Sequence, residues 1–175
     1  RKVQSGLSST EPSQDQINDL LEHYQAGRLV EADALAASLT QQFPKHPFGW
    51  NVLGVILQQT GRLNESLAPL QNSVELSPLD ADAHSNLGVT LKELGRLDEA
   101  ENSYRHAITL KPDYAAAHNN LGSTLREMGR LDEAEASYTH AIESKPDFAS
   151  ALYNRSQLLF EKAQYEAALR DADAC

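Results

Sequence analysis

Large and small apolar residues follow one another in a fixed order along residues 81–114, and the same order returns along residues 115–148. In each segment a Leu-Gly pair precedes a leucine, and then come a small residue, a tyrosine, a second small residue and a proline. These residues are Leu87, Gly88, Leu91, Ala100, Tyr104, Ala107 and Pro112, followed by Leu121, Gly122, Leu125, Ala134, Tyr138, Ala141 and Pro146. Repetition at a fixed period predicts a stack of similar units, each of which buries its apolar face only against its neighbours.

Each segment is predicted to hold two helices. Residues 81–94 contain no proline and one interior glycine, and Gly95 is expected to end this helix because glycine adopts the left-handed conformation without steric cost. Asp98 is expected to cap the second helix, which ends at about Leu110 because Pro112 cannot continue it. The corresponding caps of the neighbouring segments are Asn64 and Asp132.

The spacing of the turn residues sets a frame of 34 residues. Gly-Arg-Leu begins at residues 27, 61, 95 and 129, and proline recurs at residues 44, 78, 112 and 146. The units are then residues 13–46, which diverge most, 47–80, 81–114, 115–148 and a partial fifth repeat at 149–175. In the fifth unit a second helix is expected to begin at about Tyr165. Residues 1–12 lack the pattern and are expected to form a flexible leader.

The period and its residue types resemble the tetratricopeptide repeat (TPR) family. Trp50, Leu53, Gly54, Leu57, Leu70 and Pro78 carry the same pattern in the second unit. The resemblance implies an all-α fold, a right-handed α-solenoid of tandem 34-residue helix–turn–helix repeats whose first helices line a concave groove. Residues 83–88 (AHSNLG) and 117–122 (AHNNLG) also resemble the superhelix of O-linked N-acetylglucosamine transferases, which implies recognition of extended protein segments.

Composition excludes several classes of function. The chain has 175 residues and a formal net charge of −10, which argues against binding to nucleic acid or to anionic membranes. No apolar run is long enough to span a membrane, so a cytoplasmic location is expected. The single cysteine, Cys175, excludes a disulfide framework and a thiolate metal cage.

Candidate catalytic residues turn out to be repeat positions. His84 and His118 are 34 residues apart, as are His106 and His140, so they indicate repeat consensus rather than a metal or catalytic cluster. No catalytic motif or phosphate-binding glycine loop is present. The chain by itself is therefore expected not to be an enzyme, and to hold no metal and no cofactor.

Binding is better supported, because the positions that vary between units fall at steps of three and four along the first helix, and so on one face. The face comprises Asp82, Ser85, Val89 and Lys92 in the third unit, Ala116, Asn119, Ser123 and Arg126 in the fourth, and Ser150, Tyr153, Gln157 and Phe160 in the fifth. It is either a ligand surface or unconstrained solvent surface, and the resemblance favours a peptide-binding groove. Variable positions on the second helix, such as Arg105 and Ala136, are expected to be plain exterior.

One position of the predicted groove stays constant. Asn86, Asn120 and Asn154 occupy the sixth place of successive units. Asparagine is a mediocre helix former, and its amide can both donate to and accept from an extended peptide backbone. The alternative is that these amides bond across adjacent helices and hold the stack.

The expected ligands follow from the groove's charge. The fifth places hold no lysine, so the cationic clamp that some tetratricopeptide domains use for a terminal carboxylate is missing. Lys92 and Arg126 are each followed by an acid, which makes the groove roughly neutral. Three functions stay open: a scaffold or adaptor that binds other proteins or peptides, a substrate-recruiting arm of a larger enzyme such as an O-GlcNAc-transferase-like glycosyltransferase, and self-association through an uncapped C-terminal end.

Overall fold

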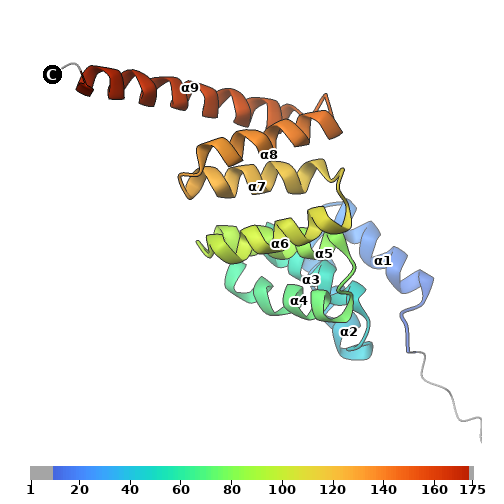
Figure 1. Ribbon diagram of the computed structural model, residues 1–175. Helices are drawn as coiled ribbons and strands as arrows, with labels where there is room; N and C mark the ends of the chain where they lie inside the picture. The colour runs from blue at the N-terminus through green and yellow to red at the C-terminus, as the bar shows by residue number, and fades with distance from the viewer. Residues whose placement is uncertain (1–9, 174–175) are drawn as a thin grey trace, which may run out of the picture. The chain divides into compact units, whose positions relative to one another are not determined.

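The computed structural model describes the backbone of residues 10–173 and the side chains of residues 10–165; most of the predicted leader and Cys175 lie outside these residues. Within residues 10–173 the chain forms nine helices and no strand, as the sequence predicts (Figure 1). The helices are α1 (Gln14–Gln25), α2 (Leu29–Gln42), α3 (Pro47–Gln59), α4 (Leu63–Leu76), α5 (Ala81–Glu93), α6 (Leu97–Leu110), α7 (Ala115–Glu127), α8 (Leu131–Ser144) and α9 (Ala149–Asp173). The fold is an all-α helical repeat solenoid.

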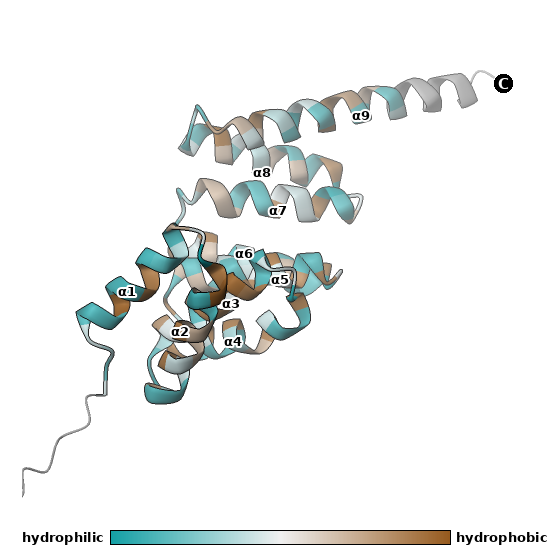
Figure 2. Cartoon of the chain, turned by 180° about the vertical axis from the view of Figure 1, so that it is seen from behind, coloured by the Kyte–Doolittle hydropathy of each residue, from teal (hydrophilic) through white to brown (hydrophobic). Residues whose placement is uncertain are grey.

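The chain divides into two compact units, Arg1–Pro78 and Leu79–Cys175. In the first unit α1 packs on α2, α2 on α3 and α3 on α4. Hydrophobic positions gather where these helices meet (Figure 2), and Leu20, Ala36 and Ile56 are fully buried there.

In the second unit each helix from α5 to α9 packs on the next one along the chain. In addition, α5 contacts α7, and α7 contacts α9. The first helices of three successive repeats are therefore neighbours, and they form one surface of this unit.

The turns within the repeats depend on glycine, as predicted. Gly95 and Gly129 have φ values of +73° and +76°, in the left-handed region that side chains with a Cβ rarely adopt. The neighbouring space is empty, since a Cβ built at either glycine meets nothing within 4 Å. The glycines are therefore required by backbone conformation and not by packing.

The predicted helix caps are wrong. Helices α6 and α8 begin at Leu97 and Leu131, so Asp98 and Asp132 lie inside the first turn. Asn64 likewise lies inside the first turn of α4, which begins at Leu63. The glycine reverses the chain so tightly that the arginine after it is already the N-cap residue, without a side-chain capping bond. The acids of this turn still favour the helix, because they lie at the positive end of its dipole.

The two helices of each repeat approach closely at the glycine of the Leu-Gly pair. A Cβ on Gly88 would lie 2.7 Å from Tyr104, and a Cβ on Gly122 would lie 2.7 Å from Tyr138. Both tyrosines are buried. The predicted role of these glycines, which is to let the facing aromatic ring pack against the helix backbone, is confirmed.

The second helix expected near Tyr165 does not form. Helix α9 continues without interruption from Ala149 to Asp173. The reason lies in the turn position: Ala163 occupies the place of Gly27, Gly61, Gly95 and Gly129 in the repeat. Alanine is the best helix former and avoids the left-handed conformation, so the chain stays helical where the other repeats turn.

Candidate functional site

The residues of the predicted groove lie on α5, α7 and α9 of the second unit. Four of them, Lys92, Ser123, Arg126 and Asn154, line a pocket of about 250 Å³. The same pocket is lined by three residues that were not predicted to be groove residues, Glu127, Tyr138 and Glu161. One polar pocket thus draws side chains from the first helices of three successive repeats.

Ion pairs bridge these helices. Lys92 Nζ lies 2.6 Å from Glu127 on the next repeat, and 4.0 Å from Glu93 beside it in the chain. Arg126 Nη2 lies 2.7 Å from Glu161, again one repeat further on. In the first unit Gln59 Nε2 donates to Tyr24 Oη at 2.6 Å, at the same pair of repeat positions. The sequence analysis expected a roughly neutral groove because an acid follows each base in the chain. In the structure the closest acid to Lys92 and to Arg126 lies instead on the next repeat.

Asparagine side chains also bond across the helices. Asn154 Nδ2 donates to Asn119 Oδ1 at 2.9 Å, and Asn119 Nδ2 donates to Asn120 Oδ1 at 3.3 Å. Asn119 is buried, whereas Asn120 and Asn154 are half-buried, as is Asn86. The contact between α7 and α9 therefore runs from the sixth place of one repeat to the fifth place of the other.

Tyr104 and Tyr138 occupy the same place in successive repeats, but within the described part of the chain only one of their hydroxyl groups has a hydrogen-bond partner. Tyr138 Oη lies 3.2 Å from Ser123 Oγ, within hydrogen-bonding distance. Tyr104 Oη is buried and has no hydrogen-bond partner among the residues that the structure describes. The difference follows from the ninth place of the repeat, where Val89 stands in the position of Ser123. Burial raises the pKa of both phenols, and for Tyr104 the nearby carboxylates of Glu93 and Glu127 raise it further.

Ser85 is the predicted groove residue that is least accessible. It is only 3% exposed. It forms a hydrogen bond with Tyr114, whose pKa is raised to about 12 by burial and by a hydrogen bond to Asp82. Ser85 therefore belongs to the packing between α5 and the turn before α7.

The fifth repeat presents the most open side chains of this surface. Tyr153 and Phe160 are each 64% exposed, and Gln157 is exposed between them. Val89, in the third repeat, is half-buried. Exposed aromatic side chains offer a large contact area at a small loss of conformational entropy.

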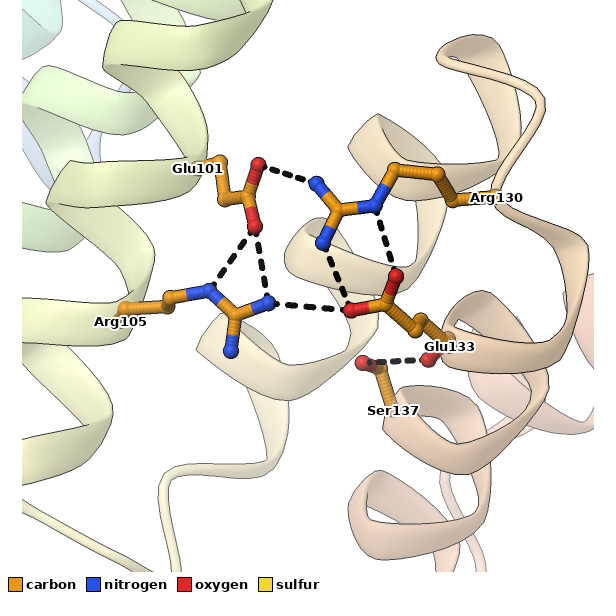
Figure 3. A network of polar contacts seen from close by, with 5 residues as sticks. All are labelled: Glu101, Arg105, Arg130, Glu133 and Ser137. Carbon is orange, nitrogen blue, oxygen red and sulfur yellow. Dashed lines mark hydrogen bonds and ion pairs between the residues drawn. The ribbon is translucent and has the colours of Figure 1, made fainter.

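The second helices carry a network of ion pairs that contradicts the expectation of plain exterior at Arg105. Figure 3 shows Glu101 and Arg105 on α6 facing Arg130 at the start of α8 and Glu133 on α8. Arg130 lies 2.6 Å from both Glu101 and Glu133, and Arg105 lies 2.8 Å from Glu101. Burial alone would raise the pKa of Glu101, but hydrogen bonds from Arg130 and Arg105 hold it below its ordinary value.

A second pocket, of about 410 Å³, lies beside this network between α6, α7 and α8. Arg105, Glu133, Ala136 and His140 are among its lining residues. The sequence analysis did not predict this pocket, because most of its lining residues repeat between the third and fourth units, and Arg105 and Ala136 were expected to be plain exterior.

The histidines pack in pairs between the two helices of one repeat. The ring centroids of His84 and His106 are 4.3 Å apart, and those of His118 and His140 are 5.4 Å apart. Among the side chains that the structure describes, no group of three or more histidine, cysteine or acidic residues is arranged to hold a metal ion. None of the described helices is both long enough and apolar enough to cross a membrane.

Solved structures share this fold. TTC0263, a thermophilic TPR protein of Thermus thermophilus, is 26% identical with a TM-score of 0.68, over 81% of this chain and 78% of that chain. YrrB, described as a TPR protein with an unusual peptide-binding site, is 22% identical with a TM-score of 0.74, over 86% of this chain and 76% of that chain. The first TPR of Spaghetti (RPAP3), bound to an HSP90 peptide, is 18% identical with a TM-score of 0.65, over 67% of this chain and 93% of that chain.

Family models agree with the structural comparison. No curated protein matches the chain in sequence. A model described as TPR repeat matches residues 90–128, and two models described as tetratricopeptide repeat match residues 70–102 and 115–148. These matches overlap and together cover the two units whose internal repetition is plainest. Residues 70–148 of the chain are therefore tetratricopeptide repeats.

Proposed function

We propose that the second unit binds extended peptide segments along the surface of α5, α7 and α9, and that the protein acts as a scaffold or adaptor. The observation that carries this proposal is the pocket of about 250 Å³, which Lys92, Arg126 and Asn154 line from three successive first helices. An extended peptide can follow such a row of equivalent positions, because each repeat offers it a similar set of polar atoms.

The chemistry of the surface points to recognition by backbone and shape. The two bases of the pocket are paired with Glu127 and Glu161, so a charged ligand would have to displace an existing ion pair. The side chains of Tyr153, Gln157 and Phe160 are open beside it. We therefore expect ligands without a high net charge, which present an amide-rich backbone to the pocket and an apolar or aromatic side chain to α9.

The comparisons support a peptide as the ligand class. YrrB is described by its peptide-binding site, and the RPAP3 domain is bound to a peptide. Both share the fold of this chain. Because the second and fifth places of its first helices hold no lysine, we propose that this chain binds internal segments and not terminal carboxylates.

Selection from a library of random linear peptides displayed on phage tests the proposal. Peptides that bind the chain are expected to lose about tenfold in affinity with Tyr153→Ala, because an exposed aromatic anchor contributes about 1 kcal/mol. Tyr165→Ala is the matched control, since Tyr165 is an equally exposed tyrosine on the same helix but outside the predicted groove. Equal losses with the two variants would refute the proposed surface.

The asparagines are tested by changing Asn86, Asn120 and Asn154 together to alanine. At about 1 kcal/mol per hydrogen bond, the triple variant is expected to lose about a hundredfold in peptide affinity. Asn102→Ala on α6 is the control for an exposed asparagine away from the groove. Unchanged affinity with reduced stability would assign the asparagines to the helix stack alone.

A further inference from the structure

The outer side of α9 is an apolar helix face whose counterpart in the preceding repeat is covered. Leu159 is 44% exposed, although Leu125, its counterpart in that repeat, is 1% exposed. Leu152 is 41% exposed, and its counterpart His118 is 9% exposed. In the preceding repeat the second helix, α8, packs on α7, and among the described residues α9 has no such partner in its own repeat because it does not turn.

The shape of α9 determines what can cover this face. Since the helix continues through Ala163, residues 164–173 run onward from the face instead of folding back over it, and α9 extends past the ends of α7 and α8 (Figure 1). Those residues still hold the second-helix register, because Ala168 occupies the place of Ala100 and Ala134. The segment that would form the second helix of this repeat therefore extends away from the face that a second helix covers in the preceding repeat.

We propose that a second copy of this chain supplies the cover. Two α9 helices pair antiparallel, so that residues 164–173 of each copy lie across Leu152 and Leu159 of the other. The interface is isologous, because each copy donates the same segment and offers the same face. Straightening a turn and exchanging the element beyond it is the usual route to a domain-swapped dimer.

Charge is consistent with the antiparallel arrangement. Residues 164–173 hold three acids, Glu166, Asp171 and Asp173, against one base, Arg170. On the first half of α9, Arg155 donates a hydrogen bond to the neutral hydroxyl of Thr139 at 3.5 Å. Antiparallel pairing brings the acidic half of one helix to the half that carries Arg155 in the other, which favours this orientation over a parallel one.

Light scattering measures the molar mass of the 175-residue chain over about a thousandfold range of concentration. The mass is expected to rise from 19.2 kDa to twice that value as the concentration increases. Leu159→Glu is expected to hold the mass at 19.2 kDa, since the pairing would bury its charge. Val30→Glu is the control, because Val30 is 82% exposed and lies in the first unit, and its mass is expected to follow that of the unchanged chain.

Ala163→Gly tests the exchange itself. Glycine permits the turn found at Gly129, so each segment is expected to fold back over its own chain and the variant to stay monomeric with its helical circular dichroism retained. A mass of 19.2 kDa for the unchanged chain at every concentration would overturn the proposal. So would an Ala163→Gly variant that associates as strongly as the unchanged chain, because its contact would not depend on the straight helix.

Discussion

Tyr104 and Tyr138 provide a matched pair for measuring one hydrogen bond. The two rings are fully buried and pack in the same way, each 2.7 Å from the Cβ position of a glycine on the facing helix. Their phenols differ, since Tyr138 Oη has Ser123 Oγ at 3.2 Å and Tyr104 Oη has no partner among the described residues. Removing the hydroxyl from each ring therefore compares an unpaired phenol with a paired one, while the close approach of each ring to its glycine is kept.

The expected effects have opposite signs. A buried polar group without a partner costs about 1–3 kcal/mol, so Tyr104→Phe is expected to raise the free energy of unfolding by about 1 kcal/mol. A satisfied hydrogen bond contributes about 0.5–1.5 kcal/mol, so Tyr138→Phe is expected to lower it by about 1 kcal/mol. Urea titration followed by circular dichroism measures both, with hydrogen exchange of α5–α8 as a readout that does not assume two-state unfolding.

Val89→Ser completes this comparison. It places a hydroxyl where Ser123 stands in the next repeat, so Tyr104 gains a partner. In that background Tyr104→Phe is expected to become destabilising, as Tyr138→Phe is in the unchanged chain. The reasoning is refuted if Tyr104→Phe destabilises the unchanged chain as much as Tyr138→Phe does.

Three further outcomes are expected. Gly122→Leu is expected to lower the free energy of unfolding by about 1–3 kcal/mol through overpacking against Tyr138, and an unchanged urea midpoint would contradict this. Gly129→Ala is expected to cost about 1–2 kcal/mol through its φ of +76° alone, so Gly129→Asn, which tolerates this conformation better, is expected to cost less in the same titration. Hydrogen bonds from Arg130 hold the pKa of Glu133 below its ordinary value of 4.5. This stabilisation is complete above that pH and is lost as the pH falls through the lower pKa of the folded state. The thermal midpoint is therefore expected to decline below about pH 4.5, and to decline less steeply in Arg130→Met. Equal slopes in the two proteins would refute the coupling.

Much of the fold could be predicted because the glycines and prolines that end the helices recur every 34 residues. Gly95 and Gly129 follow helices because glycine readily adopts a positive φ, which the residue type alone indicates. Gly88 and Gly122 could be assigned to the close helix contact because a tyrosine recurs at a fixed place on the facing helix. The N-cap residues were harder, because the polar residue that favours a cap in sequence lies inside the first turn when glycine completes the reversal one residue earlier. The continuous helix α9 depends on Ala163, which stands where the other repeats have the glycine of the turn. One changed residue is easily overlooked when the rest of the unit matches the repeat.

The site could be predicted only in part. The face was visible from the steps of three and four, but partners across it depend on how helices of successive repeats are offset. Lys92 Nζ lies closer to Glu127 of the next repeat than to its chain neighbour Glu93, and Asn154 donates to Asn119 of the preceding repeat. Such offsets depend on how the helices of successive repeats pack, so they cannot be predicted from the residue spacing within one repeat.

The most direct measurement of the proposed function is a map of hydrogen exchange in the chain with and without a peptide selected from the phage library. Binding along the proposed surface predicts slower exchange in α5, α7 and α9, strongest near Asn154 and Gln157, with α6 and α8 almost unchanged. Protection centred on α6 and α8 beside Arg105 and His140 would contradict the account, because it would place the ligand in the pocket between those helices.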